Sequence, residues 1–370
     1  MAHRDNFTLG GNISASTNAS ANISTAAEPV TVKVLKTFCY CVIMLMSLIG
    51  NTLVITIIYR NKRMRTTTNK LIANMAISDL LFPLFAVPRE TAQILIGKSR
   101  WLVGGVGGEI LCKIVNFSQD ISTAVSILSL VVIAFDRFYA VKFPFKPAII
   151  TPKMCRIIIV FIWIVAIGIH SPYFYTFRLK TVQNDLFCVN EWEPAFDSIP
   201  TQKVYFLIIF VVLISFPIAV ITILYTAIAI EVWKQKGPAE RSCQERQRRE
   251  YENRKVLKQV VTVVVVFVSC ITPITIFGCL VHFVWNLKLP PEVDGLNFRF
   301  SALFIMHSNA AISPCIYFIF NKNYRKDFIE IVQSYTRMFS GVKPSASDQS
   351  KLESRVVHAT KQSTPRCQYI

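Results

Sequence analysis

An acid, an arginine and an aromatic residue follow one another at Asp136-Arg137-Phe138, at the end of a long apolar stretch. Because an arginine is costly to bury in hydrocarbon, an ionisable residue at such a position indicates a functional role. The ordinary alternative is an arginine that only extends to the lipid headgroups, as basic residues beside membrane helices commonly do. The triplet occurs in many proteins, so its meaning depends on the side of the membrane that it faces.

A second group of polar residues lies inside apolar stretches, at Asn51, Asp79, Ser126, Asn309 and Ser313. A carboxylate at mid-membrane requires a cation, a proton or hydrogen-bond donors to offset its desolvation. Two states of Asp79 therefore stay open, a carboxylate beside a cation and a protonated, hydrogen-bonded acid. The sequence offers no constellation of metal ligands or of an activated nucleophile, so we do not expect an enzyme.

Seven apolar stretches position these residues. Apolar residues make up 52% of the 370, too many for an ordinary soluble domain. A helix of about 20 apolar residues spans the ~30 Å of bilayer hydrocarbon. The stretches are Phe38–Tyr59, Leu71–Val87 (extended by Thr91–Ile96), Ile114–Phe135, Ile157–Tyr175, Val204–Ile230, Val260–Trp285 and Phe300–Phe320. We predict an all-α membrane protein, a seven-helix bundle over residues 33–320.

The orientation of the bundle follows from its ends and its loops. Glycosylation sequons at Asn6, Asn12, Asn18 and Asn22 predict that residues 1–32 form a disordered, glycosylated, extracellular segment. A fifth sequon, at Asn116, lies inside the third stretch and should be inaccessible. Without a preceding signal peptide, the first stretch is expected to act as a signal anchor.

Loop charges give the same orientation. The loops that would face the cytoplasm hold nineteen Lys and Arg residues, and the outer loops hold nine. Asp136-Arg137 therefore faces the cytoplasm. The net charge of +18 reflects this topology and attraction to anionic lipid, so nucleic acid is not an expected partner.

Two of the ten cysteines, Cys112 and Cys188, fall in outer segments, where the compartment is oxidising. We expect them to form the one disulfide, while Cys39 and Cys41 are either free or a buried pair. After the last stretch, residues 321–339 have apolar residues near helical spacing, which predicts an amphipathic eighth helix on the cytoplasmic membrane surface. Residues 340–370 are expected to be a disordered cytoplasmic tail rich in phosphorylatable Ser and Thr.

Short motifs occur in a fixed order along the stretches. They are Gly50-Asn51, Asn74-Met-Ala-Ile-Ser-Asp79, the pair Cys112 and Cys188, Asp136-Arg137-Phe138, Trp163, Pro217 with Tyr225, Phe267-x-x-Cys270-x-x-Pro273 and Ser313-Pro314-x-x-Tyr317. Together they resemble the rhodopsin-family (class A) G-protein-coupled receptors over residues 33–339. The resemblance implies a multi-pass protein of the plasma membrane that activates a heterotrimeric G protein.

The resemblance assigns roles to matched residues. Arg137, with Asp136, Phe138, Tyr225 and Tyr317, would be the switch that opens toward the G protein. Asp79, Ser126, Asn309 and Ser313 would line a cavity for an allosteric sodium ion, the one cofactor that the family suggests. Receptor kinases and arrestin would be further partners, through the tail.

Three departures from the family pattern are relevant to the switch. Ile271 stands where most members carry Trp, and Ser313 replaces the usual Asn or Asp before Pro314. Asn253 stands where many relatives carry an acid that holds the switch arginine, and Glu252 lies about 100° around the helix from it. These departures predict a weakly held resting state with appreciable signalling in the absence of ligand.

Gln119 bears on the ligand, because monoamine receptors of the family carry an Asp there. It resembles receptors for neuropeptide Y, neuropeptide FF and orexin, as do Pro88 and Cys188-Val-Asn-Glu191-Trp192. Alternating stretches around Gln183-Asn184-Asp185 predict a hairpin lid of the kind found in peptide receptors.

Nine acids gather at the outer mouth and would attract a basic peptide with an amidated end: Glu90, Glu109, Asp120, Asp185, Glu191, Glu193, Asp197, Glu292 and Asp294. The expected ligand contacts are Gln119, Asp120, Thr123, Glu191, Ile271, Phe277 and His307. Alternatives are a small amine held by Asp120 and, less favoured, a seven-helix transporter or pump. The last stretch has no Lys, which excludes retinal.

Overall fold

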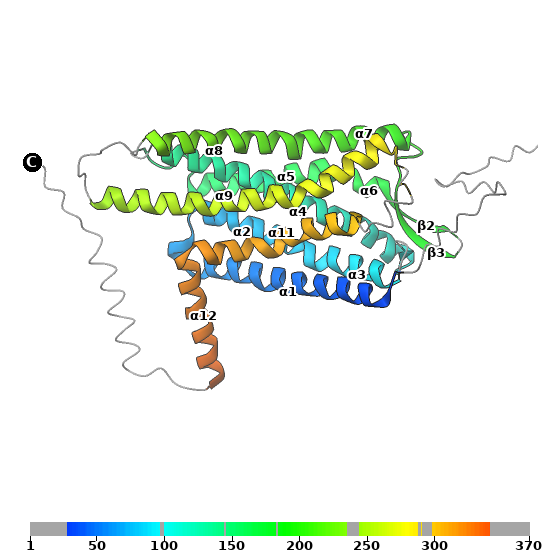
Figure 1. The fold of residues 1–370 in the computed structure, drawn as a ribbon, viewed down its shortest axis with the longest axis horizontal. Coiled ribbons are helices and arrows are strands. Elements are labelled where there is room, and N and C mark those ends of the chain that lie inside the picture. Colours follow the sequence, from blue (N-terminus) through cyan, green and yellow to red (C-terminus); the bar gives the residue numbers. More distant parts are fainter. Residues whose placement is uncertain are drawn as a thin grey trace, which may run out of the picture.

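The computed structural model describes residues 28–96, 100–143, 146–182, 184–234, 244–287, 290 and 298–340. Seven helical segments in this part of the chain are long and apolar enough to cross a membrane, and they lie side by side as a bundle (Figure 1). The end of the bundle that carries Cys112 is called the outer end, and the end that carries Asp136 the inner end. The sequons at Asn6, Asn12, Asn18 and Asn22 and the tail after Ser340 lie outside the described residues.

The bundle is helical because hydrocarbon offers backbone groups no hydrogen-bond partners, so each span must satisfy its own. Two inner ends are capped by threonines: Thr66 accepts from Asn69 N, and Thr151 accepts from Met154 N. In chain order the helical elements, with η2, η3 and η4 π-helical, are α1 (Val30–Arg60), α2 (Thr67–Asp79), η2 (Phe82–Ala86), α3 (Val87–Ile96), α4 (Gly105–Lys142), α5 (Pro152–His170), α6 (Tyr173–Thr176), α7 (Ser198–Ile209), η3 (Phe210–Ser215), α8 (Phe216–Lys234), α9 (Gln244–Cys279), η4 (Leu280–Val284), α11 (Phe298–Phe320) and α12 (Lys322–Ser340), together with a 3-10 turn, η1 (Lys62–Met64).

The predicted seven-helix bundle is confirmed, and the second span continues to Ile96 as expected. Arg89 lies within this continuation, in α3, and α4 begins at Gly105, earlier than the predicted start at Ile114. Pro83 lies in the π-segment η2 and Pro88 in the first turn of α3, so both prolines are accommodated in one continuous helical run.

Asn51 fixes α1 against α11. Pro314 has no N–H, so it cannot bond the carbonyl of Ala310 one turn earlier in α11. The Asn51 side chain donates Nδ2–H to that carbonyl oxygen at 2.9 Å instead. Gly50 allows this approach, because a Cβ there would lie 2.7 Å from Cβ of Pro314.

Asn74 joins three helices in a similar way. Its Nδ2 donates to Ser129 Oγ on α4 at 3.1 Å, and its Oδ1 accepts from Trp163 Nε1 on α5 at 2.9 Å. All three side chains lie within the main apolar core, which includes Leu71, Leu130 and Ile162. These bonds fix the spacing of α2, α4 and α5.

A three-stranded antiparallel sheet covers the outer end, with strand order β1-β3-β2. The hairpin of β2 (Phe177–Val182) and β3 (Asp185–Asn190) is the predicted lid, while β1 (Arg100–Trp101) was not predicted. The expected disulfide joins Cys112 in α4 to Cys188 in β3, with their Cα atoms 5.7 Å apart. The lid is thereby held over α4.

The amphipathic helix predicted at residues 321–339 is α12, which turns away from the bundle axis near the inner end (Figure 1). Asp327 is buried and accepts from Asn61 Nδ2 at 3.0 Å, so α12 is tied to the end of α1. Tyr324 is also buried, which raises the pKa of its hydroxyl, as does the charge of Asp327.

Replacing Asn51 by Leu is expected to lower the unfolding temperature of the purified receptor, because the carbonyl of Ala310 would lose its donor in a non-aqueous core. The loss should correspond to about 1–3 kcal/mol. Thr56→Ala is the matched control, since its hydroxyl is exposed and bonds only within α1. Equal melting curves for the two variants would contradict the assignment.

Candidate functional site

The inner end holds Arg137 against its neighbour in α4. Arg137 Nε donates to Asp136 Oδ2 at 3.1 Å, and its Nη2 forms a second, short contact to the same oxygen. Thr68 Oγ1 in α2 also donates to Asp136 Oδ2, at 3.1 Å. Asp136 is 6% exposed, so this ion pair lies in a poorly hydrated environment, where it is weakly screened.

The other predicted switch residues form no hydrogen bond to this pair. Phe138 packs against the main core, with the Lys142 ammonium 5.3 Å from its ring centroid. The hydroxyls of Tyr225 and Tyr317 are buried, and neither has a hydrogen-bond partner among the described residues. Buried polar groups without partners are costly, so these hydroxyls favour any rearrangement that supplies acceptors.

A cavity of about 40 Å³ lies at the centre of the bundle and is lined by Asp79, Ser126 and Asn309. Ser126 Oγ donates to Asp79 Oδ1 at 3.2 Å, while Asn309 Oδ1 is buried and has no partner in the described chain. The volume is enough for an ion or one or two waters. Ser313, the fourth predicted residue, donates its hydroxyl to the Asn309 carbonyl at 2.9 Å and does not line the cavity.

The outer wall of the same cavity holds Gln119, Thr123, Ile271 and His307, four of the expected ligand contacts. The Tyr40 hydroxyl lies 3.3 Å from His307 Nδ1. Each ring nitrogen of His307 donates or accepts according to the tautomer. Both His307 Nε2 and Gln119 Oε1 are buried without partners among the described residues. Two residues of the cavity wall thus each carry a polar atom that a ligand could satisfy.

The three remaining expected contacts are Asp120, Glu191 and Phe277, and they lie outside the central cavity. Asp120 accepts from Tyr173 Oη at 2.6 Å, close to Tyr205. Phe277 is buried between the rings of Trp285 and Phe298. None of these residues lines the central cavity.

Several acids of the outer mouth are already neutralised. Glu191 pairs with Lys180 at 2.6 Å, Asp185 with Arg100 at 2.8 Å and Glu109 with Lys113 at 2.9 Å. Glu90 and Asp120 differ from them, because neither forms an ion pair within the described ranges. The attraction of the mouth for a basic ligand therefore depends on fewer carboxylates than the sequence indicates.

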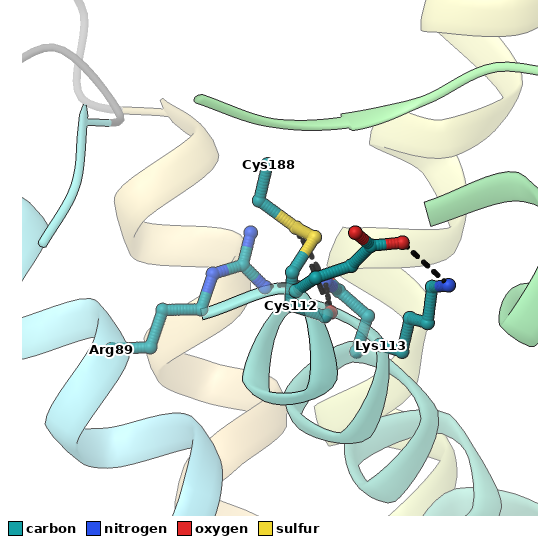
Figure 2. Close-up of a disulfide and its surroundings, with 6 residues drawn as sticks. Arg89, Cys112, Lys113 and Cys188 are labelled. Atoms are coloured by element: carbon teal, nitrogen blue, oxygen red, sulfur yellow. Dashed lines mark hydrogen bonds and ion pairs between the residues drawn. A yellow bond between two sulfur atoms is a disulfide. The ribbon is translucent and has the colours of Figure 1, made fainter. Parts of the chain in front are cut away.

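Arg89 and Asn116 were missed at the sequence level. Arg89 Nη1 donates to Asn116 Oδ1 at 2.7 Å, and Asn116 Nδ2 donates to the Cys112 carbonyl at 2.7 Å. Figure 2 shows the guanidinium reaching toward the disulfide. The signal was present as an arginine beside Glu90 within a membrane span, the kind of residue that indicates function in a membrane.

Comparison with known proteins gives the family. Residues 50–317 match the model of the 7 transmembrane receptor (rhodopsin family). The chain is 30% identical to a QRFP-like peptide receptor of Branchiostoma floridae, over 80% of this chain and 76% of that protein. It is 31% identical to the RYamide receptor of Drosophila melanogaster, over 81% of this chain and 63% of that protein. It is 30% identical to neuropeptide FF receptor 2 of Mus musculus, over 80% of this chain and 71% of that protein. The chain belongs to the rhodopsin family of seven-transmembrane receptors.

Proposed function

We propose that the protein is a plasma-membrane receptor for an extracellular peptide with an amidated end, and that it activates a heterotrimeric G protein through Arg137. The observation that carries the peptide assignment is the pair of buried polar atoms without partners on residues of the cavity wall, His307 Nε2 and Gln119 Oε1. A primary carboxamide can satisfy both atoms, because it has an oxygen that accepts and an NH₂ group that donates. The names of the similar receptors, for RYamide and neuropeptide FF, point to the same ligand class.

A basic side chain of the peptide would bind near Asp120 and Glu90. Both lie toward the outer end, and neither forms an ion pair in the part of the chain that the structure describes. Asp120 already accepts from Tyr173, which holds the carboxylate in place for a cation. An arginine could then form a bidentate pair with it. The three acids that are paired with their own lysines and arginines, Glu109, Asp185 and Glu191, would contribute steering more than affinity.

Activation would follow from rearrangement of the inner end. Ligand in the central cavity contacts Ile271 on α9, a helix that packs mainly on α11. Movement of α9 would let Arg137 leave Asp136 and bring acceptors to Tyr225 and Tyr317. The predicted weak restraint at Asn253 would favour this step, although the side chains of Glu252 and Asn253 lie outside those described. In this orientation the N-terminus is extracellular, and the cytoplasmic tail would bind receptor kinases and arrestin.

A sodium ion fits the central cavity in the ligand-free state. Asp79 supplies the charge, and Ser126 and Asn309 supply oxygens, including the unpartnered Asn309 Oδ1. Bound sodium would stabilise the carboxylate that otherwise faces hydrocarbon. The chain thus has three oxygen-bearing side chains for the ion, since Ser313 is engaged within α11.

Gln119→Ala and Asp120→Asn are each expected to weaken the binding of an amidated Arg-Phe type peptide, for different reasons. Loss of Gln119 should reduce the preference for the amide over the free acid, because the acceptor for the NH₂ group is removed. Loss of Asp120 should weaken both forms about tenfold or more. Calcium and cyclic AMP responses to matched amide and acid peptides measure this, with Glu191→Gln as the control. If small amines activate the wild type, no peptide does, and Asp120→Asn abolishes the response to amines, the amine alternative is correct.

Sodium should raise the unfolding temperature of the purified receptor relative to the same concentration of choline, because it compensates the Asp79 charge. Asp79→Asn is expected to remove this difference, and Ser313→Ala is expected to retain it. An equal rise in wild type and Asp79→Asn would show that sodium acts elsewhere.

A further inference from the structure

A second cavity, of about 210 Å³, lies between α3, α4 and β1. It shares no lining residue with the central cavity. Its walls are mostly apolar, with Pro88 on α3 and Leu111 and Val115 on α4. It is smaller than the roughly 300–1,000 Å³ pockets that hold drug-sized ligands, so its occupant must be small.

Two buried hydrogen-bond donors in the walls have no acceptor. Arg89 Nε and Trp101 Nε1 are both buried, and neither has a partner among the described residues. The one hydrogen bond that Arg89 makes goes to a neutral amide, Asn116 Oδ1, at 2.7 Å, and no carboxylate of the described chain forms an ion pair with it. A guanidinium has five donors, and Arg89 uses one of them in its bond to Asn116, while the charges of Glu90 and Asp120 act on it without forming an ion pair.

Both donors are held in fixed positions. Asn116, which accepts from Arg89, also donates to the Cys112 carbonyl, next to the disulfide that anchors β3 (Figure 2). Trp101 belongs to β1, which pairs with β3 at Leu186. The arrangement therefore exists without a ligand, as expected of a binding site rather than of two side chains that happen to be near.

The chemistry of the walls selects the occupant. Both free groups are donors and one is cationic, so the occupant must bring an acceptor, preferably an anion. The remaining walls are apolar. We propose that this cavity binds a small amphiphilic carboxylate, with its head at Arg89 and Trp101 and its apolar body between α3 and α4.

Two sources could supply such a group. The cavity opens on the outside of the bundle, where Leu84 is 56% exposed and Leu102 is 63% exposed. A fatty acid could therefore enter from the outer leaflet with its head and first carbons in the cavity, and a short aryl or alkyl acid could enter from water. Failure of this proposal is distinguishable from failure of the proposed peptide function, because the tests below use no peptide.

The test is thermal unfolding of the purified full-length receptor with phenylacetate and with phenylacetamide, which has the same shape without the charge. Phenylacetate should raise the unfolding temperature of wild type, and phenylacetamide should raise it much less. Arg89→Gln should increase the half-saturating concentration of phenylacetate at least roughly tenfold. Arg178→Gln, a change at an exposed arginine of β2, is the matched control and should behave like wild type. Equal effects of the two compounds, or an unchanged response in Arg89→Gln, would overturn the proposal.

A second measurement does not depend on the folding of Arg89→Gln. 4-Bromophenylacetate should quench tryptophan fluorescence in wild type, and this quenching should be largely lost in Trp101→Phe. Quenching that persists in Trp101→Phe would overturn the proposed location. The source of the carboxylate is identified with the receptor in nanodiscs. A rise in unfolding temperature with oleate in the bilayer indicates a lipid from the outer leaflet. A rise with phenylacetate alone indicates a water-soluble acid.

Discussion

Hydrocarbon cannot accept or donate hydrogen bonds, and this constraint governs most of what the structure shows. Polar side chains inside the bundle must find partners within the protein, and where they do, helices are fixed. Asn51 takes the carbonyl that Pro314 leaves free, and Asn74 joins α2, α4 and α5. The bonds of Asp136 to Arg137 and Thr68 belong to the same class.

Where polar atoms remain without partners, the same constraint marks functional positions. Gln119 Oε1, His307 Nε2 and Asn309 Oδ1 face the central cavity, and the hydroxyls of Tyr225 and Tyr317 lie further inward. Three of these five groups belong to the wall of the central cavity, and two belong to the predicted switch. A ligand, an ion and a rearranged inner end would each satisfy a different part of the set.

The packing of α9 differs between its outer end and its inner part. At the outer end, α9 and α7 are held together, with the Phe206 ring stacked on His282 at 4.2 Å and set into the space at Gly278. Further inward, α9 packs mainly on α11 and α8 mainly on α4. A groove of about 530 Å³ lies between η3 with the start of α8 on one side and α9 with η4 on the other, and Ile271 lines both this groove and the central cavity. Ile271 therefore connects the central cavity to the surface of α9 that faces η3.

The sequence was sufficient for the bundle, the disulfide and the hairpin lid, because hydrophobic length, cysteine placement and alternation are local signals. It was not sufficient to predict which charged side chains form ion pairs with one another. Glu109, Asp185 and Glu191 look like a surface for basic ligands, and only the fold shows that each has its own cation. The contact between Arg89 and Asn116 also escaped the sequence, because it joins two helices and depends on the fold.

We propose that Arg137 leaves Asp136 when α9 moves, and the most direct test of this coupling is a distance. Spin labels at Tyr59→Cys on α1 and Val261→Cys on α9 occupy exposed positions. With Asp136→Asn added, pulsed electron paramagnetic resonance should show a shift toward longer distances without ligand, together with faster nucleotide exchange on the G protein. An unchanged distance distribution, with nucleotide exchange at the wild-type rate, would contradict the claim.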